Sequence, residues 1–116
     1  MRHRSKKITL SRTPAERKAL QRKMAISLFK AGKIQTTATR ATFVRRFVEP
    51  LITKGKKGDL TARRQLIAAL GNADAAELVL EKAKLYVARP GGYTRVTKLA
   101  KRRAGDAALL VQLEFV

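Results

Sequence analysis

Apolar positions in the first third of the chain recur at helical spacing. Leu20, Met24 and Leu28 stand four residues apart, which predicts one buried face of a helix. The stretch TPAE at 13–16 supplies a capping threonine, a proline suited to the first helical position and a glutamate that completes a capping box. Gly32 is of the residue type that most often ends helices. The pattern therefore predicts a first helix that begins within TPAE and ends near Gly32.

A short strand and a second helix are predicted next. KIQTT at 33–37 contains β-branched residues that favour a strand, and Thr37 or Thr39 is placed to start the helix. Pro50 falls inside the helical pattern, where it removes a backbone donor and clashes with the preceding turn. We therefore expect Pro50 to kink or split this helix. Its predicted apolar stripe consists of Val44, Phe47, Val48, Leu51 and Ile52.

Two further helices are predicted after a loop rich in glycine and lysine. Asp59 or Thr61 can cap the first of them, which has the sequence LTARRQLIAAL. Asn72 or Asp74 starts the second, ADAAELVLEKAKLYVA, and RPGG at 89–92 stops it. The buried face of the first of these helices is predicted to include Leu66, Ile67 and Leu70.

The last quarter of the chain alternates between apolar and polar positions, as strands do. YTRVTKLA at 93–100 and AALLVQLEFV at 107–116 are predicted as strands, with KRRAGD at 101–106 as the hairpin connection. The predicted class is α+β, a two-layer α/β fold in the order α-β-α-α-α-β-β. We expect the helices to pack on one face of a small three-stranded mixed sheet. Residues 1–12 are predicted as an extended basic N-terminal arm and residues 13–116 as a single globular α/β domain.

Charge is the dominant feature of the composition. The 116 residues include 27 Lys and Arg but only 8 Asp and Glu, a formal net charge of +19. Residues 1–57 hold 17 basic and 2 acidic residues, whereas residues 58–116 hold 10 and 6. Such an excess opposes compaction unless a polyanion neutralises it, and solvation alone would favour mixed signs. Nucleic acid is therefore the expected partner, and the helix that carries Asp74, Glu77 and Glu81 is expected to face away from it.

Residues suited to catalysis or metal binding are scarce. The chain has no cysteine and one histidine, His3, which excludes thiolate sites, His-based metal clusters and a catalytic triad. Gly91-Gly92 follows a helix and precedes a strand, the reverse of the order that a phosphate-binding helix N-terminus requires. Glu77 and Glu81 share a helix face that could bind a metal, but the neighbouring lysines favour a solvated surface. We expect no enzyme activity, cofactor, metal, small-molecule substrate or membrane span.

The arm and the segment after the fourth helix supply groups that suit nucleic acid. Basic side chains of residues 1–12 can pair with phosphates and release counterions, so affinity should fall steeply with salt. Gly91 and Gly92 allow close approach of a sugar–phosphate strand. Tyr93 either stacks on an unpaired base or packs its ring over the sheet edge. Because aromatic residues are few, recognition of folded RNA by shape and backbone fits better than a stacking platform.

Six short motifs occur in a fixed order along the chain. They are MRHR at 1–4, MAISLF at 24–29, KIQTT at 33–37, RFVEPLIT at 46–53, GGYTR at 91–95 and RAGDAA at 103–108. Together they resemble the bacterial large-subunit ribosomal protein seventeen family, over essentially the whole chain. The resemblance implies a two-layer α/β fold with a basic N-terminal extension, bound to large-subunit rRNA near the outer end of the peptide exit tunnel. It also implies a cytoplasmic, architectural protein without catalytic activity.

The resemblance further implies RNA-binding residues in MRHR, in KIQTT with the residues that follow it, and in GGYTR. They are Arg2, His3, Arg4, Thr36, Thr37, Arg40, Gly91, Gly92, Tyr93, Thr94 and Arg95. Basic residues of the arm, the first helix and the hairpin complete the predicted rRNA-binding set. They are Lys6, Lys7, Arg12, Arg17, Arg22, Lys23, Lys98, Lys101, Arg102 and Arg103. The chain departs from the family pattern at Glu16-Arg17 and at Lys23, and it ends at Val116, so contacts through a charged tail are not expected.

The sequence thus predicts a structural constituent of the large ribosomal subunit that binds and stabilises folded large-subunit rRNA. Its expected partners are that rRNA and neighbouring large-subunit ribosomal proteins, and it is not expected to homo-oligomerise. The alternative is a free-standing RNA or DNA chaperone or a nucleoid-type packaging protein. An enzyme that acts on RNA is a third class of function.

Overall fold

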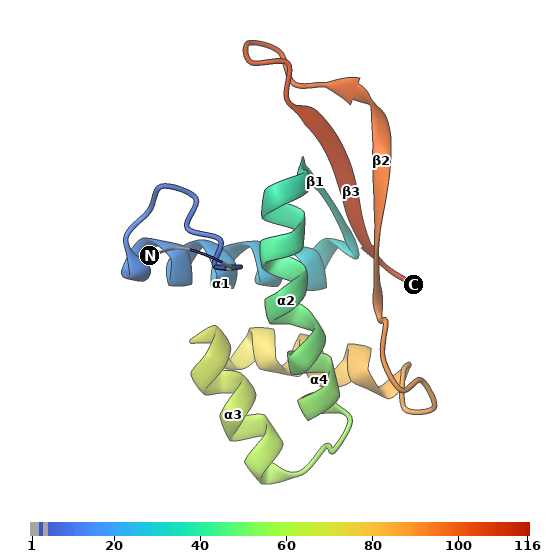
Figure 1. Cartoon of the computed structure of the whole chain (residues 1–116). Helices are drawn as coiled ribbons and strands as arrows, with labels where there is room; N and C mark the ends of the chain where they lie inside the picture. The colour runs from blue at the N-terminus through green and yellow to red at the C-terminus, as the bar shows by residue number, and fades with distance from the viewer. Residues whose placement is uncertain (1–2, 4) are drawn as a thin grey trace.

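The computed structural model describes residue 3 and residues 5–116, and its elements follow the predicted order. In this part of the chain four helices accompany one three-stranded sheet, which confirms the α+β class (Figure 1). The elements are α1 (Pro14–Ala31), β1 (Lys33–Thr37), α2 (Ala38–Gly55), α3 (Leu60–Leu70), α4 (Ala73–Lys84), β2 (Thr94–Arg102) and β3 (Leu109–Phe115).

The ends of α1 form as the sequence predicts. The Thr13 hydroxyl accepts a hydrogen bond from the Glu16 N–H, and the Glu16 carboxylate accepts one from the Thr13 N–H, both at 3.3 Å. Gly32 ends the helix in the left-handed region at φ 82°, and its N–H donates to the Leu28 carbonyl. This conformation suits glycine because it has no Cβ. Both helix-end predictions are confirmed.

Of the two outcomes predicted for Pro50, a kink or a split of the helix, the structure excludes the split. α2 continues through Pro50 as one helix. Pro50 lies on the exposed side, while Val48 and Ile52 on the opposite side are fully buried and hold the helix in place. α3 begins after Asp59, whose carboxylate accepts from the Ala62 N–H at 2.7 Å. Of the two cap candidates, Asp59 is therefore the one used.

Helix α4 begins as predicted and ends early. The Asn72 side-chain oxygen accepts from the N–H groups of Asp74 and Ala75, which makes Asn72 the cap. The helix stops at Lys84, four residues before the predicted end, and turns follow. The Tyr86 hydroxyl donates to the Val116 carbonyl at 2.7 Å, which ties this segment to the end of the sheet. This contact joins residues 30 positions apart, so the local sequence does not indicate that the helix ends before Tyr86.

The sheet is antiparallel throughout, so the prediction of a mixed sheet is wrong. Its strand order is β1-β3-β2, and β3 pairs antiparallel with both neighbours. β1 and β2 run in the same direction but lie on opposite edges. A mixed sheet would require β1 to pair with β2. The hairpin connection also lies later than predicted, because β2 includes Lys101 and Arg102 and the turn spans 103–108.

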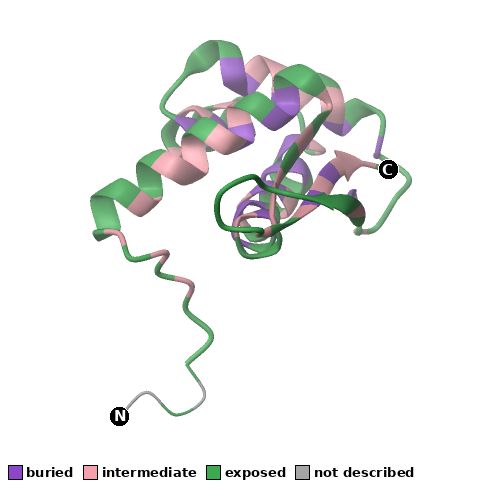
Figure 2. Ribbon diagram, turned by 90° about the horizontal axis from the view of Figure 1, so that it is seen from above, coloured by how far each residue is buried: buried purple, intermediate pink, exposed green. Residues whose placement is uncertain are grey.

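The helices form a layer beside the sheet. α2 contacts all three strands, and α1 contacts β1, whereas α3 and α4 pack against each other and against α2 and α1 (Figure 1). Buried residues line the inner faces of these elements, and the distal part of the hairpin is exposed (Figure 2). The largest fully buried side chains are Tyr93, Leu28, Ile52, Leu66, Leu113, Val44, Val48, Val79 and Val111.

Candidate nucleic-acid interface

The segment before α1 carries the first group of predicted RNA-binding residues. Arg2 and Arg4 lie outside the described residues. His3, Lys6 and Lys7 are exposed, and residues 5–12 form neither helix nor strand. Figure 2 shows the segment leaving the N-terminal end of α1 in an extended form.

Two arginines of the helices hold this segment by its backbone. Arg46 Nη1 donates to the Lys6 carbonyl at 3.1 Å, and Arg17 Nη1 donates to the Arg12 carbonyl at 2.8 Å. Both bonds use guanidinium groups, whose several donors leave others available for phosphate. The lysine side chains of the segment therefore stay exposed while its backbone is attached to α1 and α2.

Arg22, a predicted RNA-binding residue of α1, has a structural role. Its Nε donates to the Ala69 carbonyl at 2.9 Å and its Nη2 to the Ala68 carbonyl at 3.0 Å. These carbonyls belong to the last turn of α3, where a cation also complements the helix dipole. Lys23, the next residue, is exposed. Arg22 therefore binds the end of α3, whereas the side chain of Lys23 does not.

The predicted RNA contacts after β1 lie together where that strand meets α2. Thr36 and Thr37 end β1, and Arg40 lies in the first turn of α2. All three are half-buried. The structure thus brings all three residues together at the junction of β1 and α2. Their contact with rRNA stays a prediction.

The GGYTR segment is attached to α2 by Glu49. The carboxylate of Glu49 accepts from the N–H groups of Tyr93 and Thr94 at 3.2 and 3.0 Å, and from the Thr94 hydroxyl at 2.6 Å. Arg45 pairs with the same carboxylate at 3.7 Å. Gly92 has φ 64°, a left-handed conformation that favours glycine. The N–H groups of Tyr93 and Thr94 therefore point toward α2, and the half-buried Gly91 and the exposed Gly92 form the bend before them.

Tyr93 packs into the core. Its ring is 1% exposed and lies 5.4 Å from the Tyr86 ring, so the packing interpretation is supported and base stacking by this ring is not. The Lys56 ammonium donates to the Tyr93 hydroxyl at 2.7 Å and to the Arg89 carbonyl at 2.6 Å. Hydrogen bonds with Lys56 and then Thr53 lower the pKa of Tyr93 below its usual value. Lys56 thus fastens both ends of the loop before β2.

The β2–β3 hairpin exposes a second group of cations. Lys98, Lys101, Arg102 and Arg103 are all exposed, and the strand pairing shifts register between Lys98 and Arg102. Figure 1 shows the hairpin extending beyond the helices. Its distal cations are therefore accessible on a part of the molecule that projects away from the helices.

Two arginines of this hairpin are partly neutralised. Arg95 Nε pairs with Glu114 at 3.2 Å across the strands, and Arg103 Nε donates to Asp106 at 3.1 Å in the turn. The hydrogen bond from Arg103, together with one from the Ala108 N–H, lowers the pKa of Asp106 to about 2. Asp106 therefore stabilises the turn, and it lies in the stretch KRRAGD that the sequence predicts as the hairpin connection.

The acidic residues of α4, Asp74, Glu77 and Glu81, lie on the surface of the helix. Glu77 pairs with Arg63 of α3, and Asp74 and Glu81 are exposed. Among the described residues no three potential metal ligands come together. None of the helices described is both long and apolar enough to cross a bilayer. Whether α4 faces away from a polyanion stays a prediction.

Three residues that organise this surface were missed by the sequence analysis. Glu49, Lys56 and Arg46 act on partners between 33 and 45 residues away along the chain. Glu49 offered one available signal: it is one of only two acidic residues among the first 57. A rare carboxylate in a basic region is expected to bind particular donor groups within the fold. Lys56 and Arg46 had no such signal, because lysine and arginine are common throughout.

Comparison with known proteins identifies the family. A family model described as "Ribosomal protein L17" matches residues 20–116. The chain is 47% identical over 116 residues to "Large ribosomal subunit protein bL17" of Lawsonia intracellularis, covering 99% of this chain and 92% of that protein. It is 45% identical over 117 residues to the protein of the same name in Campylobacter lari, covering 100% and 99%. The chain therefore belongs to the ribosomal protein L17 family.

Proposed function

We propose that this chain is a structural constituent of the large ribosomal subunit that binds and stabilises folded large-subunit rRNA. As a member of a ribosomal protein family it is a cytoplasmic ribosomal component that serves translation. Relatives bear the name of a large-subunit protein, which supports assignment to that subunit. A position near the peptide exit tunnel is part of the proposal and rests on the family resemblance alone.

The observation that carries the proposal is the imbalance between cations and carboxylate partners. The chain has 27 Lys and Arg. Among the described residues only Arg45, Arg63, Arg95 and Arg103 form ion pairs with carboxylates. The remaining basic side chains repel one another in the free protein. A polyanion such as rRNA relieves this repulsion and releases its own counterions.

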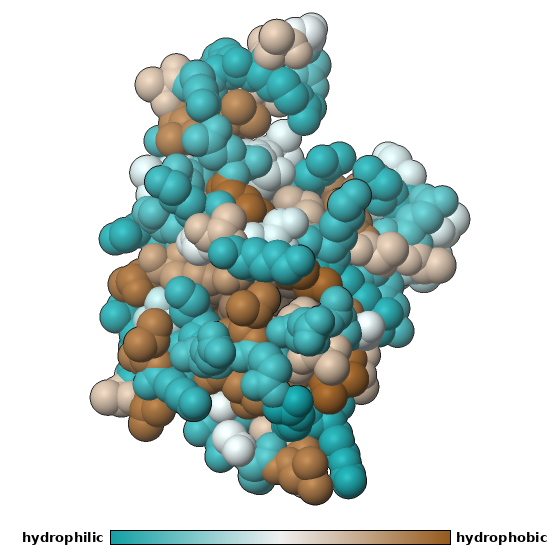
Figure 3. Space-filling model, turned by 180° about the vertical axis from the view of Figure 1, so that it is seen from behind, coloured by the Kyte–Doolittle hydropathy of each residue, from teal (hydrophilic) through white to brown (hydrophobic). Residues whose placement is uncertain are grey.

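The arrangement of these cations fits the backbone of folded RNA. Many of them stand on two exposed regions, the segment before α1 with the adjoining helices and the distal hairpin. Figure 3 shows hydrophilic side chains spread over the face seen from behind, with hydrophobic ones in small patches between them. Separate basic regions can neutralise phosphates on different parts of one folded RNA, which is what stabilising it requires. The protein then works as a monomer among neighbouring ribosomal proteins and without catalysis.

Cosedimentation tests the proposal. Tagged protein expressed in bacteria should remain with large subunits that are washed at moderate salt, and should be scarce on bulk DNA and on free RNA. Recovery mainly on bulk nucleic acid, with washed large subunits lacking the protein, would instead support a free-standing chaperone or packaging protein. Turnover of RNA by purified protein would contradict the architectural role.

A further inference from the structure

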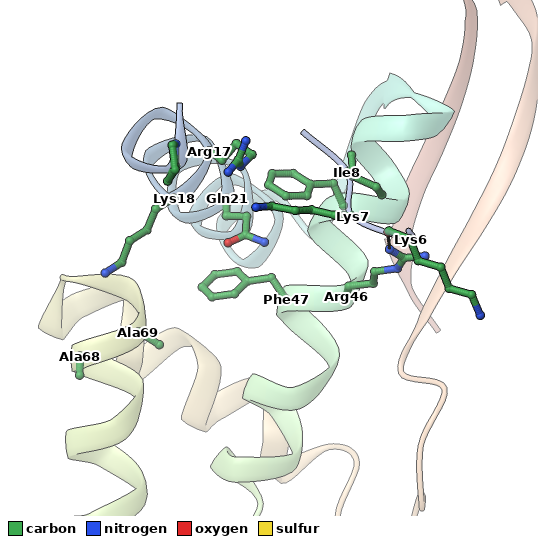
Figure 4. Close-up of a pocket in the computed structure, with 12 residues that line it drawn as sticks. Lys6, Lys7, Ile8, Arg17, Lys18, Gln21, Arg46, Phe47, Ala68 and Ala69 are labelled. Carbon is green, nitrogen blue, oxygen red and sulfur yellow. Dashed lines mark hydrogen bonds between the residues drawn. The ribbon is translucent and has the colours of Figure 1, made fainter. Parts of the chain in front are cut away.

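A groove open to solvent lies where four segments of the chain meet. Its walls come from the segment before α1, the first half of α1, the middle of α2 and the last turn of α3 (Figure 4). Its volume of about 720 Å³ falls in the range of roughly 300–1,000 Å³ found for small-molecule sites. The space can therefore admit a group as large as one nucleotide.

The rim of the groove is basic. Five cationic side chains line it, and no carboxylate does so among the described residues. None of the five forms an ion pair with a carboxylate in the described part of the chain. Gathering like charges around one space is unfavourable without an anion. The five side chains are Lys6, Lys7, Arg17, Lys18 and Arg46.

The interior of the groove is apolar and partly aromatic. Phe47 is half-buried and its ring points from α2 into the space below α1 (Figure 4). Phe43, one turn earlier on α2, is 8% exposed and lines the same space. A flat aromatic ring beside cations suits the face of a base whose phosphates lie at the rim.

Gln21 adds a polar group between the aromatic interior and the basic rim. Its side chain extends from α1 into the groove toward Phe47 (Figure 4). Within the described residues its amide takes part in none of the side-chain hydrogen bonds. An amide carries both donors and an acceptor, which can bond the edge of a base.

The walls of the groove are fixed in place. Arg46 holds the N-terminal segment through the Lys6 carbonyl, as described above. Arg22 holds the end of α3 through the carbonyls of Ala68 and Ala69, and both alanines line the groove. A site built on braced elements loses little ordering entropy when a ligand binds.

We propose that this groove holds one unstacked nucleotide of RNA. Its base lies against Phe47, within reach of the Gln21 amide, and the flanking phosphates contact the basic rim. The inference rests on the proposed function, because rRNA is the source of the nucleotide. An acidic peptide would satisfy the cations, but it would leave the aromatic surface and the amide without a matching planar partner.

The test compares two RNA probes on the full-length protein by NMR. One is a single-stranded hexaribonucleotide, and the other is the same strand with one central abasic ribose, so both carry the same phosphates. The intact strand should shift the signals of Phe47, Gln21, Ala68 and Ala69, and should bind at least about fivefold more tightly than the abasic strand. Equal affinities, or shifts confined to other surfaces, would overturn the proposal.

Three variants separate the base from the phosphates. Phe47→Leu keeps an apolar side chain and should reduce the difference between the two strands to less than about twofold. Arg46→Gln should weaken both strands alike, whereas Arg64→Gln removes the same charge from an exposed site on α3 and should have a smaller effect. If Phe47→Leu retains the full preference for the intact strand, Phe47 does not contact the base and the proposal is wrong.

The outcomes also distinguish this inference from the proposed function. Wild-type protein that binds large-subunit rRNA but shows no preference for the intact strand would refute only the nucleotide groove. Wild-type protein that fails to bind large-subunit rRNA would refute the proposed function and the groove with it. Groove signals that shift with a hexaglutamate peptide but not with RNA would assign the site to an acidic protein segment.

Discussion

At the scale of single residues, Glu49 determines how the segment before β2 is held. Its carboxylate accepts three hydrogen bonds from Tyr93 and Thr94, both nearly fully buried. Glu49→Ala leaves these donors without their partner, so we expect the free energy of unfolding to fall by about 2 kcal/mol. Urea denaturation measures the change. Glu81→Ala is the control, because Glu81 is exposed on α4, and a change within about 0.5 kcal/mol is expected there.

The low pKa of Asp106 determines how the turn interaction depends on pH. Its folded-state pKa of about 2 lies below the ordinary value of 3.8, because Arg103 and the Ala108 N–H stabilise the carboxylate. The turn interaction is therefore fully present above about pH 4 and is lost as the pH falls through about 2. A carboxyl-detected NMR titration should show this low pKa. Arg103→Ala should move it back toward 3.8, whereas Arg102→Ala should change it much less.

Interactions between residues that are close in sequence were predictable. The capping box of Thr13 and Glu16 and the left-handed Gly32 involve neighbours within four residues, so the sequence contains the whole interaction. The contacts of Glu49 with Tyr93 and Thr94 span more than 40 residues. No periodicity or cap signal reports such a contact, because it exists only after α2 and β2 pack. The same limit explains why Tyr93 could not be assigned from sequence to the core or to a base.

At the scale of elements, the C-terminal end of α3 depends on α1. Arg22 bonds two of the last carbonyls of α3, and the Arg22 guanidinium also lies near Gly71, which ends that helix. Arg22→Ala should lower the free energy of unfolding by about 1–2 kcal/mol, because it removes two hydrogen bonds and a favourable dipole interaction. Lys23→Ala, one residue away and exposed, should change stability by less than about 0.5 kcal/mol. Equal losses in both variants would contradict this role.

The order of elements was predictable, but their pairing in the sheet was not. Hydrophobic periodicity, β-branched residues and cap signals together predicted all seven elements. The hairpin joins β2 to β3 by a short connection, which fixes their antiparallel pairing. β1 could add to either edge of that hairpin, and only packing of α2 across all three strands brings it to β3. The antiparallel sheet is thus a consequence of tertiary packing.

At the scale of the whole molecule, charge was the most informative property of the sequence. A net charge of +19 predicted a polyanionic partner, and the family assignment agrees with that prediction. The nucleotide groove could not be predicted in the same way. Its residues come from four segments between Lys6 and Ala69, and their convergence depends on how α1, α2 and α3 cross.

The basic residues of the N-terminal segment should make RNA binding depend strongly on salt. Deleting residues 1–12 removes five basic residues but leaves the Thr13 cap of α1. Each phosphate that the shortened protein no longer neutralises should reduce the slope of log affinity against log salt by about 0.7–0.9. If all five basic residues pair with phosphates, the deletion flattens the slope by up to about 4.5, while helical content measured by circular dichroism stays unchanged.

A charge-matched pair of variants shows whether position or total charge is responsible. Lys6→Gln with Lys7→Gln and Lys82→Gln with Lys84→Gln each remove two positive charges, the first from the N-terminal segment and the second from α4. We expect the first pair to reduce the salt slope by about 1.5 and the second to leave it nearly unchanged. Filter binding to large-subunit rRNA at several salt concentrations measures both slopes. Equal reductions would mean that RNA responds to net charge alone, and the N-terminal segment would then have no special place in the interface.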